Sequence, residues 1–323
     1  MSAFRDAGAV TSVINFRPAS LSERWSQHVD RQRLLFNPAT CQRLAKSLTL
    51  FAPDLVLVLN YPGLPECAAT AMRAALRPGV PMFGWLCDQL DEFPARFEPI
   101  LDGVYYFDSA CLPVLEDSYA GTHARLEFLP LAACPKRYAC PSLDLRSRIP
   151  RLAFAGNCTP SRQAFFSEYR RLGQALDLFG PHAGNWPRVW RNCKLSPAAL
   201  AQVYRGYLIN LNLLQPGNTT HVLNLRAFEI PSAGGLATYP EVRDLARCFS
   251  PNQEILVYTS ASDLAAIVEN ILLQPDQALA ITRAGHRRVM REHTFYHRAT
   301  RMLGDWIGSS FKPNIPDYIA SSA

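Results

Sequence analysis

Short runs of apolar residues alternate with amphipathic segments along most of this chain. The runs have the length of buried strands, and the segments between them repeat apolar residues at helical spacing. This alternation is typical of α/β proteins, in which helices connect parallel strands. In the first part of the chain it predicts strands at residues 11–16, 55–59, 82–86, 103–107 and 126–129, and helices at 37–51, 66–76 and 110–119.

A second series of the same kind follows residues 141–150, a segment that contains Arg146 and Arg148 and that we interpret as an interdomain linker. Two Rossmann-like domains with parallel sheets are the expected result, with a ligand site in the cleft beyond the carboxyl ends of the strands. The second series predicts strands at residues 151–155, 175–179, 207–213 and 236–239, and helices at 161–176, 197–204, 222–233, 261–273, 275–293 and 296–307.

The predicted helix at 222–233 carries a carboxylate, Glu229, within an otherwise apolar sequence, and Gly234 and Gly235 end it. Its start is polar, with Thr220, His221 and Asn224 in and before the first turn. Free N–H groups and the helix dipole favour an anion such as a phosphate there, and Arg226 adds a positive charge. Glu229 lies further along the helix, where it can accept hydrogen bonds from ribose hydroxyls. The spacing suits a nucleotide, although a simple i,i+3 ion pair between Arg226 and Glu229 is the alternative.

The run from Asn224 to Gly235, NLRAFEIPSAGG, resembles the N-x-R-x-F-E-x-x-x-x-G segment of CgeB-like (spore maturation protein) glycosyltransferases. These belong to the group 1 glycosyltransferases of GT-B fold. Further segments match the family in the same order along residues 5–305: APDLVLVL at 52–59, GWLCD at 84–88, LPLAA at 129–133, FAGN at 154–157, and EHTF with HR at 292–298.

The resemblance implies a GT-B fold, with an acceptor-side domain at residues 1–145 and a nucleotide-sugar-binding domain at 146–295. A helix at 296–308 is expected to cross back to the first domain, and 309–323 to form a tail. The implied activity is transfer of a hexose-type sugar from a nucleotide diphosphate to a hydroxyl of a glycan, protein or small molecule. The implied chemistry retains the anomeric configuration and needs no metal. A non-catalytic GT-B scaffold or partner subunit is the alternative function.

Residue by residue, Glu229 matches the second Glu of the group's E-x7-E pattern, while His221 replaces the first. Thr220, His221, Asn224 and Arg226 are candidates to bind the diphosphate, with Arg226 also stabilising the leaving charge.

The turn after the strand at 151–155 supplies further donor-binding candidates, because Gly156 allows a close backbone approach beside Asn157. Arg162 follows in the next helix. Three other basic residues, Arg170, Arg171 and Lys194, are alternatives to Arg162 in the same part of the sequence.

Asp88 follows the predicted strand at 82–86 and is the candidate to orient or deprotonate the acceptor hydroxyl. An alternative of equal weight is that this aspartate caps the helix after the strand. Relatives often carry His-Asp here, and Cys87 replaces the histidine. In this group the donor phosphate itself can accept the proton, so a dedicated base is not required.

The start of the chain departs from the family, because residues 2–8 look like only the end of the first helix. The first strand of the first domain is therefore not evident. A truncated reading frame, a reduced first domain and an upstream start all remain open.

Composition narrows the functional classes further. The 323 residues are 48% hydrophobic and 19% charged, as in globular proteins, and 33 basic residues against 27 acidic residues give a net charge of +6 that favours anionic partners. No basic run predicts nucleic-acid binding, and no apolar run predicts a membrane span, although peripheral membrane contact is compatible with the charge. We expect a cytoplasmic protein with no cofactor beyond the co-substrate. Nine scattered cysteines predict neither disulfides nor a zinc site.

Overall fold

A computed structural model of the chain describes residues 1–14, 38–59, 66–87, 101–138, 140, 143–181, 189–191, 194–214, 221–308 and 311–320. The chain divides into two compact units. The first contains Met1–Leu129 and Met302–Lys312, and the second contains Pro130–Arg301 and Pro313–Ala323. The first stretch of the first unit thus ends at Leu129, whereas the predicted first domain extends to residue 145.

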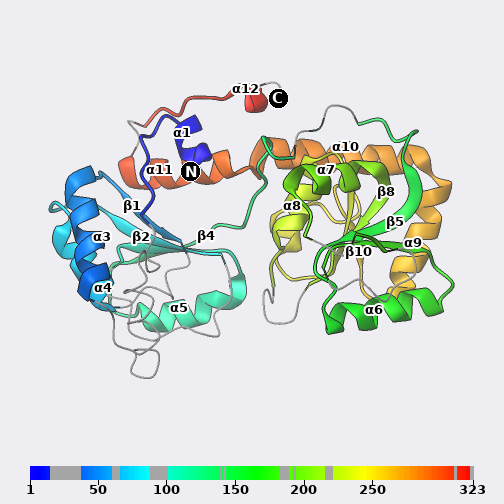
Figure 1. The fold of residues 1–323 in the computed structure, drawn as a ribbon, viewed down its shortest axis with the longest axis horizontal. Coiled ribbons are helices and arrows are strands. Elements are labelled where there is room, and N and C mark those ends of the chain that lie inside the picture. Colours follow the sequence, from blue (N-terminus) through cyan, green and yellow to red (C-terminus); the bar gives the residue numbers. More distant parts are fainter. Residues whose placement is uncertain are drawn as a thin grey trace. The chain divides into compact units, whose positions relative to one another are not determined.

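The first unit is a four-stranded parallel sheet in the order β1-β2-β3-β4 (Figure 1). Its two inner strands are buried along their whole length, as the apolar runs MFGWL and GVYY predict. The strands are β1 (Val56–Leu59), β2 (Met82–Leu86), β3 (Gly103–Tyr106) and β4 (Arg125–Phe128). The helices are α1 (Ser2–Asp6), α3 (Pro38–Phe51), α4 (Glu66–Ala75), α5 (Leu112–Ser118) and the 3-10 turn η3 (Ser109–Cys111).

These elements confirm the predicted strands at 55–59, 82–86, 103–107 and 126–129 to within one or two residues at each end. The strand predicted at 11–16 is wrong over residues 11–14, which form no strand, and 15–16 lie outside the described residues. Val13 explains the error, because its side chain is 64% exposed although its neighbours suggested a buried strand. No strand precedes β1 among residues 1–14 and 38–55.

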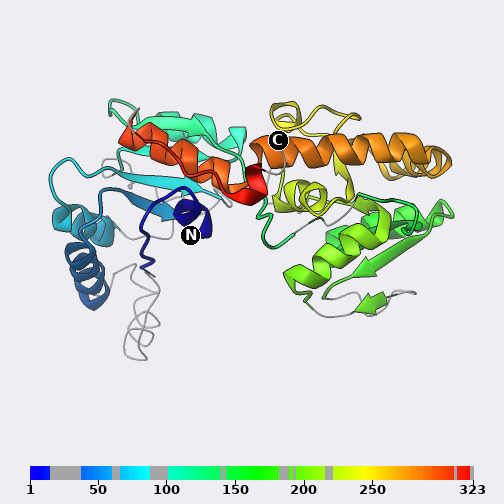
Figure 2. The same ribbon diagram turned by 90° about the horizontal axis from the view of Figure 1, so that it is seen from above.

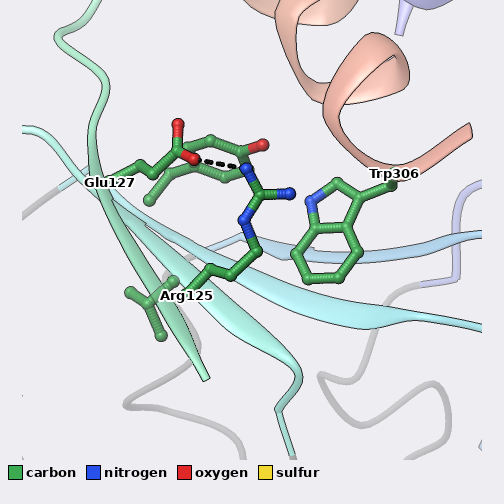
Figure 3. Close-up of a pocket in the computed structure, with 5 residues that line it drawn as sticks. Arg125, Glu127 and Trp306 are labelled. Carbon is green, nitrogen blue, oxygen red and sulfur yellow. Dashed lines mark hydrogen bonds and ion pairs between the residues drawn. The ribbon is translucent and has the colours of Figure 1, made fainter. Parts of the chain in front are cut away.

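The last part of helix α11 (Phe295–Ile307), from Met302 onward, packs on this sheet. Tyr105 donates a hydrogen bond of 2.7 Å to Asp305, and Trp306 stacks on Phe83 with ring centroids 5.1 Å apart. Figure 3 shows Arg125 between Trp306 and Glu127, where it pairs with the Glu127 carboxylate at 2.7 Å. The small hollow at this place is therefore occupied by an internal ion pair.

The second unit is a six-stranded parallel sheet in the order β10-β9-β8-β5-β6-β7. The chain enters at β5, moves outward through β6 and β7, then returns to the other side of β5 and continues through β8, β9 and β10. This is the doubly wound order, with its switch point between β5 and β8. The strands are β5 (Ile149–Ala155), β6 (Leu176–Phe179), β7 (Val189–Arg191), β8 (Tyr207–Leu211), β9 (Leu236–Pro240) and β10 (Leu256–Tyr258).

Helices cover this sheet and enclose an aromatic and aliphatic core that includes Phe154, Phe166 and Tyr258. The long helix α10 runs past α8, as Figures 1 and 2 show. Gly285 on α10 lets the backbone of Glu254, before β10, come close to α10, because a Cβ at 285 would collide with the Glu254 carbonyl. The helices are α6 (Pro160–Arg171), α7 (Pro197–Gly206), α8 (Leu225–Ser232), η4 (Leu245–Arg247), α9 (Ala261–Leu273), α10 (Pro275–Glu292) and α12 (Asp317–Ala320).

The two parallel sheets confirm the predicted α/β class with Rossmann-like units. Helix α8 begins at residue 225, not at 222, because Val222 and Leu223 are buried in the turn before it and Asn224 caps the helix. Strands β7 and β10 are additions to the prediction. Residues 313–320 make contacts within the second unit: the Asn314 carbonyl accepts a bond of 2.7 Å from Tyr296, and Lys136 lies over the Tyr318 ring.

Candidate functional site

The carboxyl ends of β5 and β8 meet at the switch point of the second sheet, where open α/β folds bind ligands. Gly156 directly follows β5, and its N–H donates to the Phe179 carbonyl at 2.8 Å. Gly180 has a φ of +135°, and a Cβ there would collide with the Gly156 carbonyl. The turn after β5 is therefore tightly packed against the end of β6.

Arg162, on the first turn of α6, joins the ends of the two central strands. Its guanidinium donates 3.0 Å hydrogen bonds to the Asn157 carbonyl after β5 and to the Leu213 carbonyl after β8. The residue is only 5% exposed and lies over the Phe154 ring. Burial, with the nearby charge of Arg226 as the second cause, lowers the pKa of Arg162 to about 10. The side chain still carries a positive charge at neutral pH.

Arg226, from the first turn of α8, lies directly over Gly156. A Cβ on Gly156 would be 2.8 Å from the Arg226 Nη2 atom, so the absence of a side chain at 156 makes room for this guanidinium. Arg226 is close enough to Arg162 to affect its pKa, and it also faces Tyr204. Two arginines from distant parts of the sequence thus gather at the switch point.

A pair of asparagines ties the start of α8 to the end of β8. Asn212 and Asn224 exchange two side-chain hydrogen bonds, of 2.8 and 2.9 Å, and Asn212 is fully buried. The Asn224 side chain also accepts from the Arg226 N–H at 3.0 Å, which makes Asn224 the N-cap of α8. The pair fixes where the helix begins relative to the central strands.

Glu229 lies one turn beyond Arg226 on α8. Burial raises the pKa of its carboxyl group above the usual value, while a hydrogen bond from Tyr138 and the charges of Arg226 and Arg137 act in the opposite direction. Both Arg226 and Glu229 are described, and no ion pair within 4.0 Å joins them. The simple i,i+3 salt bridge is therefore wrong, because the Arg226 guanidinium points to Gly156 instead.

The structure brings five of the candidate residues together: Gly156, Asn157, Arg162, Asn224 and Arg226 surround the carboxyl edge of β5, with Glu229 one helical turn away. His221 lies in the turn before α8, where its carbonyl accepts the Asp244 N–H at 2.7 Å. The candidates Asp88 and Thr220 lie outside the described residues.

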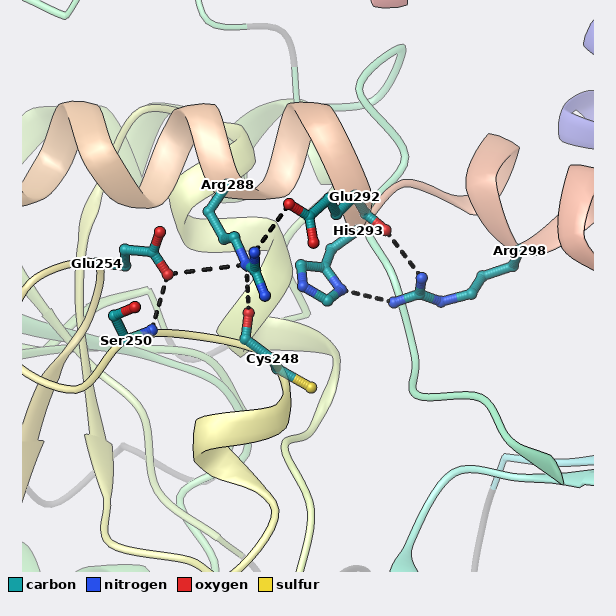
Figure 4. Close-up of polar contacts among 7 residues, drawn as sticks. All are labelled: Cys248, Ser250, Glu254, Arg288, Glu292, His293 and Arg298. Carbon is teal, nitrogen blue, oxygen red and sulfur yellow. Dashed lines mark hydrogen bonds and ion pairs between the residues drawn. The ribbon is translucent and has the colours of Figure 1, made fainter.

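A second polar cluster, around His293, supports the turn after α10 (Figure 4). The His293 ring lies between Phe228 and Phe249, with centroids 5.3 and 5.6 Å away. Burial keeps the pKa of His293 well below its usual value, with the Arg298 charge as the next cause. A ring held neutral between aromatic side chains has a structural role.

Arg288 supports the same turn from α10. Its side chain donates to the Cys248 carbonyl at 2.9 Å and pairs with Glu292 at 2.8 Å and with Glu254 at 3.8 Å (Figure 4). The EHTF segment and Glu254 therefore hold α10 and the following turn in place.

Two residues of the site were missed in the sequence. Asn212 was treated as part of the strand at 207–213, yet its side chain pairs with Asn224. Tyr138 follows the LPLAA segment, and its hydroxyl group is close enough to Glu229 to lower the pKa of that carboxyl group. An asparagine within an apolar run is a usable signal for the first, whereas nothing local marks Tyr138.

The site combines two guanidinium groups, the carboxyl ends of β5 and β8 that Arg162 holds together, and one carboxylate. Two adjacent guanidiniums without a carboxylate ion-paired to either among the described residues favour a multiply charged anion such as a diphosphate. The partly buried carboxylate on the same helix can accept hydrogen bonds from a diol. This combination matches the two polar parts of a nucleoside diphosphate.

Comparisons with known proteins agree with this fold. Residues 162–304 match the family model described as glycosyl transferase-like. No curated protein matches the chain. Similar solved structures include HepE of Anabaena in complex with UDP, at 11% identity and a TM-score of 0.63, over 83% of this chain and 82% of that one.

Two further similar structures are synthases of sugar phosphates. Sucrose-phosphate synthase of Thermosynechococcus elongatus is 14% identical over 93% of this chain and 81% of that chain, with a TM-score of 0.59. An α,α-trehalose-phosphate synthase (UDP-forming) of Burkholderia vietnamiensis is 14% identical over 84% and 79%, with a TM-score of 0.57. The chain thus has the fold of GT-B glycosyltransferases.

Within the described residues, no helix is both long and apolar enough to cross a membrane.

Proposed function

We propose that this protein is a GT-B glycosyltransferase that moves a sugar from a nucleoside diphosphate to a hydroxyl group of an acceptor. The observation that carries the proposal is the convergence of Arg162 and Arg226 at the switch point, with Glu229 one turn along the same helix as Arg226. The glycosyl transferase-like match over 162–304 covers all three residues and supports this proposal.

Each residue has a distinct role in this proposal. Arg226 binds the diphosphate and stabilises the charge that develops on it as the sugar leaves. Arg162 adds positive charge nearby, and its bonds to the Asn157 and Leu213 carbonyls hold the two strand ends that frame the diphosphate. Glu229 accepts hydrogen bonds from the ribose hydroxyls. The turn at Gly156 and the N–H groups at the start of α8 complete the donor site.

The proposal also covers features of the reaction other than donor binding. We propose a hexosyl donor, transfer with retention, and no requirement for a metal, since two arginines supply the charge that a divalent ion provides elsewhere. Asp88 is the proposed acceptor-side residue, and Thr220 and His221 the proposed contacts before α8. A narrower relationship to CgeB-like enzymes belongs to the same proposal.

Binding of nucleoside diphosphates tests this function. The purified chain would be screened by thermal shift and calorimetry against UDP, GDP, ADP and dTDP, with EDTA or with magnesium. Ligand at about 100 times its Kd should stabilise the native state by roughly 2.7 kcal/mol and raise Tm by several degrees. Equal binding in EDTA and magnesium is expected. The absence of binding to any of the four would contradict the proposal.

Matched substitutions separate the site from general effects on charge. Arg226→Ala should weaken binding of the preferred diphosphate about tenfold to 100-fold, because a charge-assisted contact is lost. Glu229→Ala should weaken nucleotide binding and turnover while the protein stays folded. Arg283→Ala on α10 and Glu168→Ala on α6 are the controls, since both side chains are exposed. A non-catalytic scaffold would show no sugar transfer in the wild type.

A further inference from the structure

The segment that follows β4 is fastened to the turn between α10 and α11 within the second unit. Ala133 forms a parallel bridge with Thr294: its N–H donates to the His293 carbonyl, and its carbonyl accepts from the Phe295 N–H, both at 2.9 Å. These two short bonds leave the backbone around Ala133 little freedom to move relative to the turn.

Arg298 adds a second fastening to the same segment. Its guanidinium donates to the Pro130 carbonyl at 2.7 Å and to the Leu131 carbonyl at 3.0 Å, and it is 6% exposed. A further nitrogen contact, of 2.9 Å, joins it to His293 (Figure 4). The LPLAA and EHTF segments therefore act together to fix one short stretch of backbone.

The fixed stretch leads directly to Tyr138, which is 5% exposed. The Tyr138 N–H donates to the Cys134 and Pro135 carbonyls at 3.2 Å, and its ring lies 6.2 Å from the Tyr204 ring. Just beyond it, Cys140 packs against Gly234, where any Cβ would collide with the cysteine sulfur. The segments before and after Tyr138 are therefore both fixed in place, and so is its ring.

The Tyr138 side chain faces α8, and its hydroxyl group is close enough to Glu229 to act as a hydrogen-bond donor that lowers the pKa of the carboxyl group. A carboxylate has two oxygens and room for several donors, so one bond from Tyr138 leaves the other lone pairs available. A fixed donor on one side also limits the rotation of the carboxylate.

We propose that Tyr138 is a positioning residue for Glu229, which orients the carboxylate so that its remaining acceptor sites meet the ribose diol of the nucleotide. This inference rests on the proposed function. It gives the fastened segment at 130–138 a task in donor binding: it holds a hydroxyl group of one segment against a carboxylate on α8. A tyrosine that merely fills the core would have no effect on how the protein distinguishes ribose from deoxyribose.

The test compares Tyr138→Phe with the wild type and with Tyr169→Phe. Phenylalanine keeps the ring beside Tyr204 and removes only the hydroxyl. Tyr169 is an apt control, because it is fully buried on α6 of the same unit and its hydroxyl has no hydrogen-bond partner among the described residues. Calorimetry would give Kd values for UDP, GDP and ADP and for their 2′-deoxy forms, with Tm as the check on folding.

For the diphosphate that the wild type binds best, Tyr138→Phe should raise Kd about tenfold and narrow the preference for ribose over 2′-deoxyribose. Tyr169→Phe should change neither. The acid limit of ribonucleotide binding should also move to higher pH in Tyr138→Phe, because the lost bond favours the ionised Glu229. Arg226, Arg137 and Tyr204 also face Glu229, and both variants retain all three.

Each contrary result has its own meaning. A folded Tyr138→Phe protein with unchanged ribose preference and unchanged pH profile would overturn the positioning role and leave the proposed function intact. A wild type that binds ribo- and deoxyribonucleotides equally would overturn the ribose role of Glu229 and, with it, this inference. Loss of affinity to the same extent for both nucleotide forms would indicate a packing role only.

Discussion

Glu229 is a residue whose burial is unfavourable for folding but whose carboxylate is available for ligand binding. Burial raises the pKa of its carboxyl group, because ionising that group costs more free energy in the folded protein than in water. Tyr138 and Arg226 offset part of this cost, but Arg226 forms no ion pair with Glu229 within 4.0 Å among the described residues. A charged group kept in an unfavourable place is typical of a site that serves a ligand.

This conflict predicts that Glu229→Gln stabilises the protein without ligand. Because the folded-state pKa is raised, the penalty is absent below the unfolded-state pKa, grows as pH rises from the unfolded-state to the folded-state pKa, and is fully present above the folded-state value. We expect a gain of about 0.5–2 kcal/mol at pH 8 and almost none at pH 4. Denaturant unfolding at the two pH values measures it. The control is Glu168→Gln on α6, an exposed carboxylate, and equal gains for the two variants would refute the prediction.

At the scale of elements, hydrophobic patterning was sufficient for most helices and strands. The prediction for 82–86 matches β2, and the one for 261–273 matches α9, because a fully apolar run and a clear helical period leave little choice. Strand β10 was missed because it has only three residues, Leu256–Tyr258, and pairs only with β9. Short edge strands are defined by the neighbour they pair with, which a local pattern does not contain.

The candidate site was predictable where chemistry and local structure coincide. Asn224, Arg226 and Glu229 lie on one short helix, so their spacing indicated a nucleotide site. The partners of these residues were not predictable, because Asn212 and Tyr138 reach α8 from other segments. The contact between Arg226 and Gly156 likewise depends on how α8 is placed against β5, and no feature of either segment alone encodes it.

The start of α8 provides a prediction at this scale. Asn224→Ala removes the N-cap and leaves the fully buried Asn212 amide without its partner, so two costs combine. The cap is worth about 1 kcal/mol and an unpaired buried amide about 1–3 kcal/mol. We expect a loss of about 2–4 kcal/mol in the free energy of unfolding.

The matched control for this prediction is Ser196→Ala, which removes the N-cap of α7 at an exposed position. That variant should lose only about 1 kcal/mol, because no buried partner is abandoned. Denaturant unfolding of both variants measures the difference. Similar losses for the two would show that the Asn212–Asn224 pair adds nothing beyond ordinary capping.

At the scale of the whole molecule, α11 is one continuous helix whose residues are shared between the two units. Its first turns belong to the second unit, where Arg298 is bonded to the Pro130 and Leu131 carbonyls. Its last turns belong to the first unit, where Asp305 and Trp306 meet the sheet. The same helix thus has a separate anchor in each unit, and each anchor is a set of named contacts that can be weakened independently.

Tyr105→Phe weakens the anchor in the first unit. The variant removes the 2.7 Å bond to Asp305 from a buried tyrosine whose pKa is raised by burial and then by that carboxylate. A hydrogen bond to a charged, partly exposed acceptor is worth about 1–1.5 kcal/mol, so the amides of residues 302–307 should exchange about tenfold faster. The amides of residues 295–301 should keep their protection, because the Arg298 contacts are untouched. Hydrogen exchange by mass spectrometry measures both stretches.

Asp305→Asn is the matched variant, since its amide oxygen still accepts from Tyr105 and most of the protection should remain. Faster exchange along the whole helix in Tyr105→Phe would mean that α11 opens as one cooperative element, and the idea of two independent anchors would then be wrong.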